Sequence, residues 1–369
     1  MKDIKSILSF YKTPSFLNQK AAIAQVVRLE ESSYRREGAR MLVFESGVFE
    51  GGISGGCLEG DTLKRSLIAI MKNKPSIVTY DTSTKSDNKI GVGLGCNGII
   101  DVLISPLTME SEIINQLEKI NSSRKSHILV TILSDMNKFK GCSLGNVYYY
   151  EENYNLSKLV DKRIKTLILN DIKLVEKNKK STFFTKELDE NKLKYFIEYI
   201  PTQIHVSIYG DNYDVYSMIN ILKPLDWDIS LVGNINKFKK EKVNHIRHVY
   251  EKTETKRPNN DERTAVLLMA HDFKSDLDNL KIVLKTKASY IGVLGPKKRF
   301  IKMLDKLNSE NIFLSKNDLS RIYAPCGLEI GANTPEEIAS SICSEIIAVF
   351  SNKKGGMLKN KKGPIHDRF

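Results

Sequence analysis

The chain has 369 residues, of which 41% are hydrophobic and 27% are charged, a composition that indicates a globular protein and excludes a disordered one. No run of about 18 apolar residues is present, so we do not expect a membrane span. The formal net charge of +13 comes from lysines spread along the chain, and no basic cluster is interleaved with aromatic residues, so we do not expect a nucleic-acid partner.

The amino terminus and the cysteines indicate the compartment. The first segment, MKDIKSILSFYKTPSF, lacks the apolar run and the cleavage site of a signal peptide, so we expect a cytoplasmic protein. No C-x-x-C pair occurs, which argues against structural zinc, and an odd number of cysteines without a secretory signal predicts reduced thiols. We expect one of them, in IASSICSEIIAV, to be packed in the core. The five cysteines are Cys57, Cys96, Cys142, Cys326 and Cys343.

The first part of the chain is predicted to be rich in β-strands, with one helix over residues 57–72. The strand segments are AAIAQVVRL, ARMLVF, VFEGGIS, PSIVTYD, GIIDVLISP, HILVTILS and NVYYYE. The apolar residues at helical spacing are Leu63, Leu67, Ile70 and Met71. From about residue 151 to 198 the sequence is rich in lysine and asparagine with weak periodicity, so we predict an irregular linker there. Residues 1–198 then form a strand-rich α+β domain that ends in this linker.

The second part alternates apolar strand segments with helical patterns, which predicts a parallel sheet covered on both faces. The strand segments are QIHVSIYG, DWDISLVG, RTAVLLMAHD and ASYIGVLG. The last helix has Thr334 as its N-cap, Pro335 in its first turn and Glu337 at the capping-box position. Its expected buried stripe is Ile338, Ile342, Ile346 and Val349. We therefore predict an α/β protein with a Rossmann-like domain at residues 199–352 and a basic, flexible tail at residues 353–369.

Two cysteines lie in glycine-rich loops. Cys57 follows Gly55 and Gly56 and precedes the helix, whose free N–H groups and positive dipole end would stabilise a thiolate. Cys96 follows Gly95 in GVGLGCNGIID, where the backbone can approach a ligand closely. The alternatives are a tight turn with Cys57 packed beneath it and an irregular hairpin turn around Cys96.

Basic residues near the first loop are candidate phosphate ligands. Arg35, Arg36 and Arg40 lie together in YRREGARML and could bind an anion at the same site, with surface charge as the alternative.

The segment VSIYGDNYDVYSM stands where a dinucleotide fingerprint would be. Gly210 is kept, but Asn212 replaces the second glycine and Val215 replaces the third small residue. The next strand ends in Gly233, where an acidic ribose-binding residue is expected. NAD(P) is therefore expected to bind weakly or not at all.

His271 and Asp272 follow a strand at the sheet edge where open α/β folds bind ligands. His271 could bind a ligand or transfer a proton; its alternative role is to cap the next helix, which Asp272 could do equally well. The turn GVLGPKKRF adds Gly295 and Lys297, either as a phosphate-binding turn or as solvated surface.

Several segments, taken in order, resemble the XdhC/CoxI family of xanthine dehydrogenase accessory proteins over about residues 20–350. They are ESSYRREGARMLV, GGISGGCLEGD, GLGCNGIIDVLISP, MAHDFKSDL, YIGVLGPKKR and APCGLEIGANTPEEIASSI. The resemblance implies an N-terminal XdhC/CoxI domain and a C-terminal Rossmann-like domain. It also implies a protein that holds the molybdenum cofactor (molybdopterin), supports its sulfuration and delivers it to a xanthine dehydrogenase-type molybdenum hydroxylase. A cysteine desulfurase and a second copy of the chain are the further partners expected.

The candidate site combines both parts of the chain, with the two loop cysteines as soft ligands for molybdenum. The candidate cofactor-binding residues are Cys57, Cys96, Gly55, Gly56, Gly95, Arg40, Glu59, Gly210, His271, Asp272, Gly295 and Lys297. We expect the two cysteine loops to face the strand ends that carry His271 and Gly295, within one chain or across a dimer. No acid–base constellation stands out, so a maturation factor without turnover is favoured over the alternative, an NAD(P)- or thiol-dependent oxidoreductase.

Overall fold

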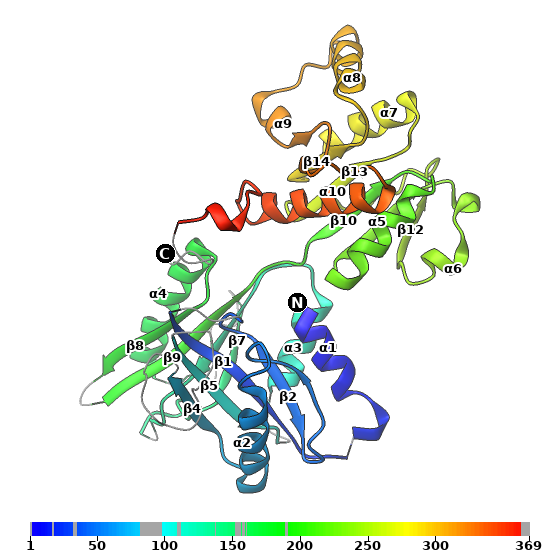
Figure 1. Cartoon of the computed structure of the whole chain (residues 1–369). Helices are drawn as coiled ribbons and strands as arrows, with labels where there is room; N and C mark the ends of the chain where they lie inside the picture. The colour runs from blue at the N-terminus through cyan, green and yellow to red at the C-terminus, as the bar shows by residue number, and fades with distance from the viewer. Residues whose placement is uncertain are drawn as a thin grey trace. The chain divides into compact units, whose positions relative to one another are not determined.

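The computed structural model describes residues 2–16, 18–31, 35–81, 98–108, 112–136, 138–151, 156, 159, 161–188 and 191–362. The chain forms two compact units that divide between Thr202 and Gln203, here called the N-terminal and C-terminal units (Figure 1). No helix within the described part of the chain has both the length and the apolar character needed to cross a membrane.

The N-terminal unit contains two antiparallel sheets, with strand orders β3-β2-β1-β5-β4 and β7-β6-β9-β8. Its helices are α1 (Lys2–Tyr11), α2 (Glu59–Lys72), α3 (Ile113–Ser122) and α4 (Lys162–Asn178), with a 3-10 turn at Pro14–Phe16. Its strands are β1 (Ala21–Glu31), β2 (Arg40–Phe44), β3 (Phe49–Gly51), β4 (Ser76–Asp81), β5 (Gly98–Pro106), β6 (His127–Ile132), β7 (Val147–Tyr150), β8 (Thr182–Leu188) and β9 (Asn191–Ile200).

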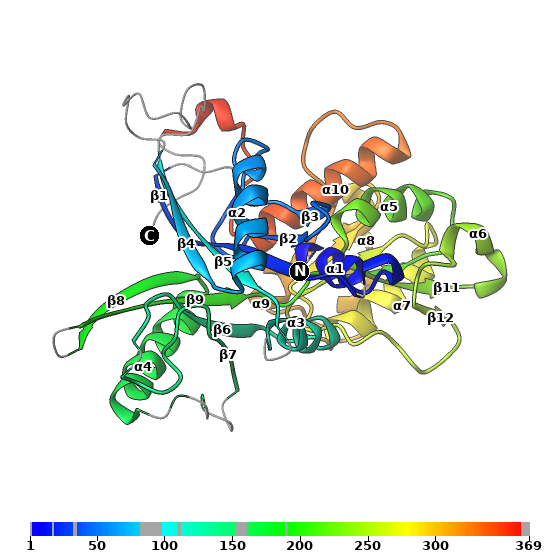
Figure 2. The same ribbon diagram turned by 90° about the horizontal axis from the view of Figure 1, so that it is seen from below.

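The two sheets pack against each other, and each has a helix on its other face. Val27, Leu103 and Phe196 meet between the sheets. Alternate residues of β1 point the other way, toward α2, while α4 covers the second sheet. Figure 2 shows α2 and α4 on opposite sides of the pair of sheets. Both faces of β1 are buried from Ala21 to Val27, and this stretch is apolar except for Gln25.

The expected linker at residues 151–198 is wrong, because most of this segment is regular structure. Helix α4 begins after Asp161, whose carboxylate accepts hydrogen bonds from the amides of Arg163 and Ile164. Strands β8 and β9 then form a hairpin. The helix buries one apolar stripe among its many lysines: Ile164, Ile168, Ile172 and Val175. That stripe has helical spacing. It is not evident from the composition of the segment, because lysines and asparagines surround it.

Helix α2 is confirmed, but its buried face is turned relative to the prediction. Met71 is 85% exposed, and Leu63 and Leu67 lie at the edge of the core. The buried face is Thr62, Ser66, Ala69 and Ile70. Thr62 is held there because its hydroxyl lies 3.1 Å from the phenol oxygen of Tyr80 on β4. This buried polar contact, which apolar spacing does not reveal, sets the rotation of the helix.

The C-terminal unit is built on a six-stranded parallel sheet of order β12-β11-β10-β13-β14-β15, as predicted. Its elements are β10 (His205–Tyr209), α5 (Asp214–Leu222), β11 (Asp228–Gly233), α6 (Lys240–Val243), β12 (His248–Glu251), β13 (Thr264–Leu268), α7 (Phe273–Leu284), β14 (Tyr290–Val293), α8 (Lys297–Ser309), α9 (Lys316–Ser320), β15 (Ile322–Tyr323) and α10 (Pro335–Phe350), with 3-10 turns at Lys223–Leu225, Ile235–Lys237 and Leu358–Asn360. Helices α5 and α10 cover one face and α7 and α8 the other (Figure 1). The strand order reverses between β10 and β13, which is where such sheets open a crevice for ligands.

The last helix follows the sequence prediction closely. Thr334 and Glu337 form a capping box, and Pro335 lies in the first turn. Ile342 and Ile346 are fully buried, and Cys343 is in the core as expected.

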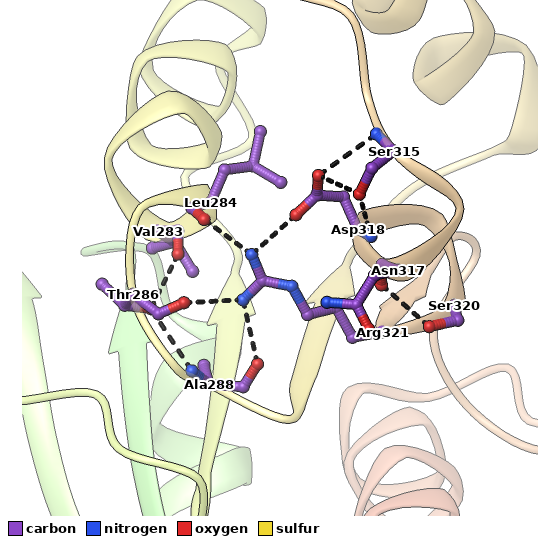
Figure 3. A network of polar contacts seen from close by, with 9 residues as sticks. All are labelled: Val283, Leu284, Thr286, Ala288, Ser315, Asn317, Asp318, Ser320 and Arg321. Carbon is purple, nitrogen blue, oxygen red and sulfur yellow. Dashed lines mark hydrogen bonds and ion pairs between the residues drawn. The ribbon is translucent and has the colours of Figure 1, made fainter.

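Arg321 ties the edge strand β15 to the rest of the sheet (Figure 3). Its guanidinium donates to the carbonyl oxygens of Leu284, Thr286 and Ala288, at or just beyond the end of α7, at 2.6–3.1 Å. It also pairs with Asp318 of α9 at 2.9 Å. The final carbonyls of a helix have no partner within the helix, so Arg321 supplies a donor to the carbonyl of Leu284 and to two carbonyls in the segment that follows.

A buried ion pair joins the two sheets of the N-terminal unit. Arg40 of β2 pairs with Glu198 of β9, and both are at most 5% exposed. Gln25 of β1 donates a further hydrogen bond to the same carboxylate at 3.0 Å. Arg40 also donates to the carbonyl of Gly38 at 2.8 Å. Because both side chains are buried, the loss of either one would leave an uncompensated charge in the interior.

Removing one partner should therefore destabilise the N-terminal unit strongly. We expect Glu198→Ala to lower its free energy of unfolding by about 3–5 kcal/mol, since Arg40 is left buried without a counter-charge. The double variant Arg40→Met/Glu198→Leu should recover most of this loss. Urea titration followed by circular dichroism measures the change, and hydrogen exchange in β1 and β9 assigns it to this unit.

The matched control is Glu118→Ala, which breaks the exposed pair between Lys12 and Glu118. That change should cost less than about 1 kcal/mol. If Glu198→Ala is no more costly than the control, the ion pair does not have the role assigned to it.

Candidate functional site

Cys57 is exposed to solvent in the loop before α2. Ser54 and Leu58 are buried, whereas the three residues between them, Gly55, Gly56 and Cys57, are exposed. The hydroxyl of Ser54 accepts hydrogen bonds from the amides of Gly56 and Leu58 at 3.2 and 3.1 Å, and the Cys57 sulfur lies 3.5 Å from it. Gly56 has φ +112°, which disfavours any other residue. The alternative with Cys57 packed beneath the turn is thus wrong.

Glu59 stabilises this loop through hydrogen bonds. Its carboxylate accepts hydrogen bonds from the amides of Ile53 and Ser54, at 3.2 and 2.8 Å, and from the Ser54 hydroxyl. Burial of Glu59 opposes ionisation, but these hydrogen bonds outweigh it and hold its pKa below the ordinary value. Glu59 therefore acts on the Cys57 loop through its backbone.

The other candidates of the N-terminal unit lie apart from the thiol or outside the described residues. Arg40 is committed to Glu198, and Arg35 pairs with Asp3. These four side chains help to line a pocket of about 290 Å³. Cys96 and Gly95 belong to residues 82–97, which fall outside the described residues, so the prediction for this second loop stays a prediction.

The carboxyl edge of the C-terminal sheet places its own side chains where a dinucleotide would bind. Asp211, in the loop after β10, accepts a hydrogen bond from the Asn234 amide at 2.9 Å and pairs with Lys237 at 3.0 Å. Burial opposes ionisation of Asp211, yet these two contacts lower its pKa. Asn212 donates to the carbonyl of Ala270, after β13, at 2.9 Å.

The two glycines of this edge are required by close packing within the protein. A Cβ at Gly210 would lie 2.4 Å from the carbonyl oxygen of Met269. A Cβ at Gly233, where the ribose-binding acid was expected, would lie 2.9 Å from the side chains of Asp211 and Phe238. The acid is absent because Asp211 and Phe238 leave no room for any side chain at this position.

His271 and Asp272 have different roles, which resolves the alternatives left open by the sequence. Asp272 caps α7 by accepting a hydrogen bond from the Ser275 amide at 2.8 Å, and this bonding lowers its pKa. His271 does not cap the helix; its Nε2 lies 2.6 Å from Oδ2 of Asp214, in the first turn of α5.

In the basic turn before α8, Arg299 has a partner within the protein and Lys297 is exposed to solvent. Arg299 pairs with the fully buried Asp276, which also accepts a hydrogen bond from the Ala270 amide at 2.9 Å. Gly295 has a positive φ of 118°, and Lys297 is exposed in the first turn of α8. Cys57 lies in one unit and these residues in the other, so the predicted meeting of their loops stays a prediction.

Comparisons with known proteins match both units. The family model described as "XdhC and CoxI family" matches residues 17–81, and the model described as "XdhC Rossmann domain" matches residues 206–346. The chain belongs to the XdhC/CoxI family. The resemblance seen in the sequence motifs is thereby confirmed.

Two of the individual relatives cover nearly the whole chain, and a third covers part of it. It is 25% identical over 333 residues to a probable xanthine dehydrogenase subunit from Bacillus subtilis (strain 168), covering 89% of this chain and 93% of that protein. It is 29% identical over 89 residues to the uncharacterized protein YqeB of Escherichia coli (strain K12), which is 24% of this chain and 16% of that protein. A crystal structure of a xanthine dehydrogenase from Bacillus halodurans matches with TM-score 0.70 and 26% identity, over 96% of this chain and 97% of that one.

The sequence did not identify two residues that position candidate functional groups in this XdhC/CoxI chain. Ser54 anchors the Cys57 loop, and its only signal was a hydroxyl in an otherwise glycine-rich segment. Asp214 orients His271, but an acidic residue in the first turn of a helix is common for dipole reasons alone, so it gave no separate signal.

Replacing Glu59 should loosen the Cys57 loop. In Glu59→Gln the side chain loses the charge that strengthens three hydrogen bonds, and for this half-buried group we expect a local loss of about 1.5 kcal/mol. That loss corresponds to roughly tenfold faster hydrogen exchange at the Ile53 and Ser54 amides. The control is Asp61→Asn, which removes an acid from the same first turn but is bonded to Arg65 and Tyr80. Equal effects of both variants would show that helix-dipole electrostatics, and not the hydrogen bonds, order the loop.

NADH and NADPH should show no micromolar binding in calorimetry. Asn212 stands where the dinucleotide fingerprint has a glycine, and the side chains of Asp211 and Asn212 are hydrogen-bonded to the neighbouring loops. In the variant Asp211→Ala/Asn212→Gly these obstacles are gone, so binding should strengthen relative to the parent. Micromolar affinity in the parent would contradict the assignment.

Proposed function

We propose that this XdhC/CoxI chain binds the molybdenum cofactor, supports its sulfuration and delivers it to a xanthine dehydrogenase-type molybdenum hydroxylase. The observation that carries the proposal is the exposed Cys57 thiol on a loop held in place by Ser54 and Glu59. Family membership, and relatives named as xanthine dehydrogenase proteins, support an accessory role in the maturation of such an enzyme.

The residues of the loop fit such a group. A thiolate is a soft ligand suited to molybdenum and to sulfur transfer. Apart from its chain neighbours, no atom of the described residues lies within 4 Å of the position that a Gly56 Cβ would take. Within the described residues no three His, Cys, Asp or Glu side chains converge as a metal site.

The chain would contribute placement and exposure of the thiol. The cofactor, when bound, supplies the molybdenum centre and its exchangeable sulfur. Ser54 and Glu59 fix the loop before any ligand arrives, so little ordering is required on binding. The exposed position of Cys57 suits transfer to another protein, because the bound group remains reachable.

The proposed partners follow from this role. They are the molybdenum hydroxylase that receives the cofactor and a cysteine desulfurase that supplies sulfur, with the carrier acting as a homodimer. We do not favour an NAD(P)-dependent oxidoreductase, because Asn212 and Val215 replace small residues of the dinucleotide fingerprint.

Removing the thiols should reduce cofactor retention without unfolding the protein. We expect chain purified from cells that make the cofactor to carry molybdenum and a fluorescent pterin. Cys57→Ser should lower both, because the hydroxyl keeps the shape of the thiol but is a hard, weak ligand. Cys96→Ser should act in the same direction.

Metal analysis and pterin fluorescence measure the loss, and circular dichroism confirms the fold. The control is Met71→Ala, which removes an exposed sulfur from the same helix α2 and should change nothing. If both serine variants retain molybdenum as the parent does, the thiols are not its ligands.

A further inference from the structure

His271 has a backbone conformation that its position in the fold does not require. Its φ is +56°. Most other non-glycine residues with positive φ lie just after a helix or 3-10 turn, where this conformation is ordinary: Asn73, Lys179, Asp226, Asn311 and Asn352. His271 instead lies between a strand and a helix. Strain of this kind persists where the surrounding structure holds a side chain in place, and it is concentrated at functional sites.

Asp214 is the group that holds the imidazole. Only 9% of Asp214 is exposed, and its Oδ2 lies 2.6 Å from Nε2 of His271. The hydrogen bond to the Asp214 carboxylate assigns the ring hydrogen to Nε2, and in that tautomer Nδ1 is an acceptor. The His271 side chain is 49% exposed, so the ring is reachable from solvent. The second oxygen of Asp214, Oδ1, is buried without a hydrogen-bond partner, which marks a polar site that the fold alone does not satisfy.

The pair lies at the point where the sheet changes direction. Asp214 follows β10 and His271 follows β13, the two strands between which the strand order reverses. This is the position at which open α/β sheets bind their ligands. Asp211 and Asp214 both follow β10 and carry carboxylates at this edge. Asp211 is paired with Lys237, whereas Asp214 lies against His271.

Two exposed aromatic side chains flank the pair in sequence. Tyr213 precedes Asp214 and is 73% exposed, and Phe273 follows His271 by two residues and is 38% exposed. Large aromatic side chains are costly to leave in water and are suited to stacking against a flat ring.

We propose that His271 and Asp214 form a binding site for a flat nitrogen heterocycle, in which Nδ1 of His271 accepts a hydrogen bond from a ring N–H. Asp214 is a positioning residue that acts through the imidazole. The choice of a pterin as probe rests on the proposed function, since a pterin is such a heterocycle; the site itself rests on the pair and its surroundings.

The test compares two probes on the full chain. Pterin (2-amino-4-oxopteridine) carries a ring N–H at N3, and 3-methylpterin lacks it. Fluorescence titration should show that the parent prefers pterin by at least about tenfold, the value of one hydrogen bond of about 1.4 kcal/mol. In His271→Gly, which keeps the left-handed backbone and removes the ring, the preference should fall below about twofold. Asp214→Asn should also reduce it.

The ratio of the two affinities separates recognition from damage to the fold, because a general loss of structure weakens both probes together. The control is Asp278→Asn, an exposed acid on α7, which should leave the ratio unchanged. An equal ratio in the parent and in His271→Gly overturns the proposal, as does absence of pterin binding to the parent. If molybdenum retention still depends on Cys57 in those preparations, the proposed function stands and only this site is rejected.

Discussion

Backbone N–H and C=O groups at the ends of parallel strands need hydrogen-bond partners whether or not a ligand is bound. In the C-terminal unit, side chains supply several of these partners. Asp211 links the loop after β10 to the loop after β11. Asn212 and Asp214 link it to the loop after β13. Asp276 and Arg299 link that loop to the helix after β14. The loops at the carboxyl edge of this sheet are therefore cross-linked by side chains of the protein itself.

Side chains also hydrogen-bond to the backbone of the Cys57 loop in the N-terminal unit. Ser54 and Glu59 satisfy the backbone amides around the turn, so the thiol is presented without help from a ligand. The two sites differ in what they leave exposed. One offers a sulfur on glycine backbone, and the other offers an imidazole fixed by a carboxylate. Both are preorganised, which lowers the ordering cost of binding.

Features with a local signal could be predicted from the sequence, and features made by distant residues could not. The continuous apolar runs revealed the parallel sheet because its strands are buried on both faces. The capping box at Thr334 fixed the start of the last helix for the same local reason. In contrast, Arg40 and Glu198 are 158 residues apart, and Asp214 and His271 are 57 apart. No periodicity or motif spacing connects such pairs, so the roles of Arg40 and Asp214 emerge only from the folded chain.

The buried pair of Arg40 and Glu198 joins a residue inside the segment matched by the first family model to a residue outside it. Arg40 lies within the segment that the XdhC and CoxI model matches, residues 17–81, whereas Glu198 lies beyond it and before the Rossmann match begins at residue 206. A fragment cut at the end of the matched segment would keep the arginine and lose its counter-charge. It would also lose β5, the central partner of β1. The smallest autonomous piece of the amino-terminal half therefore extends to about Thr202, well past the region by which family membership is recognised.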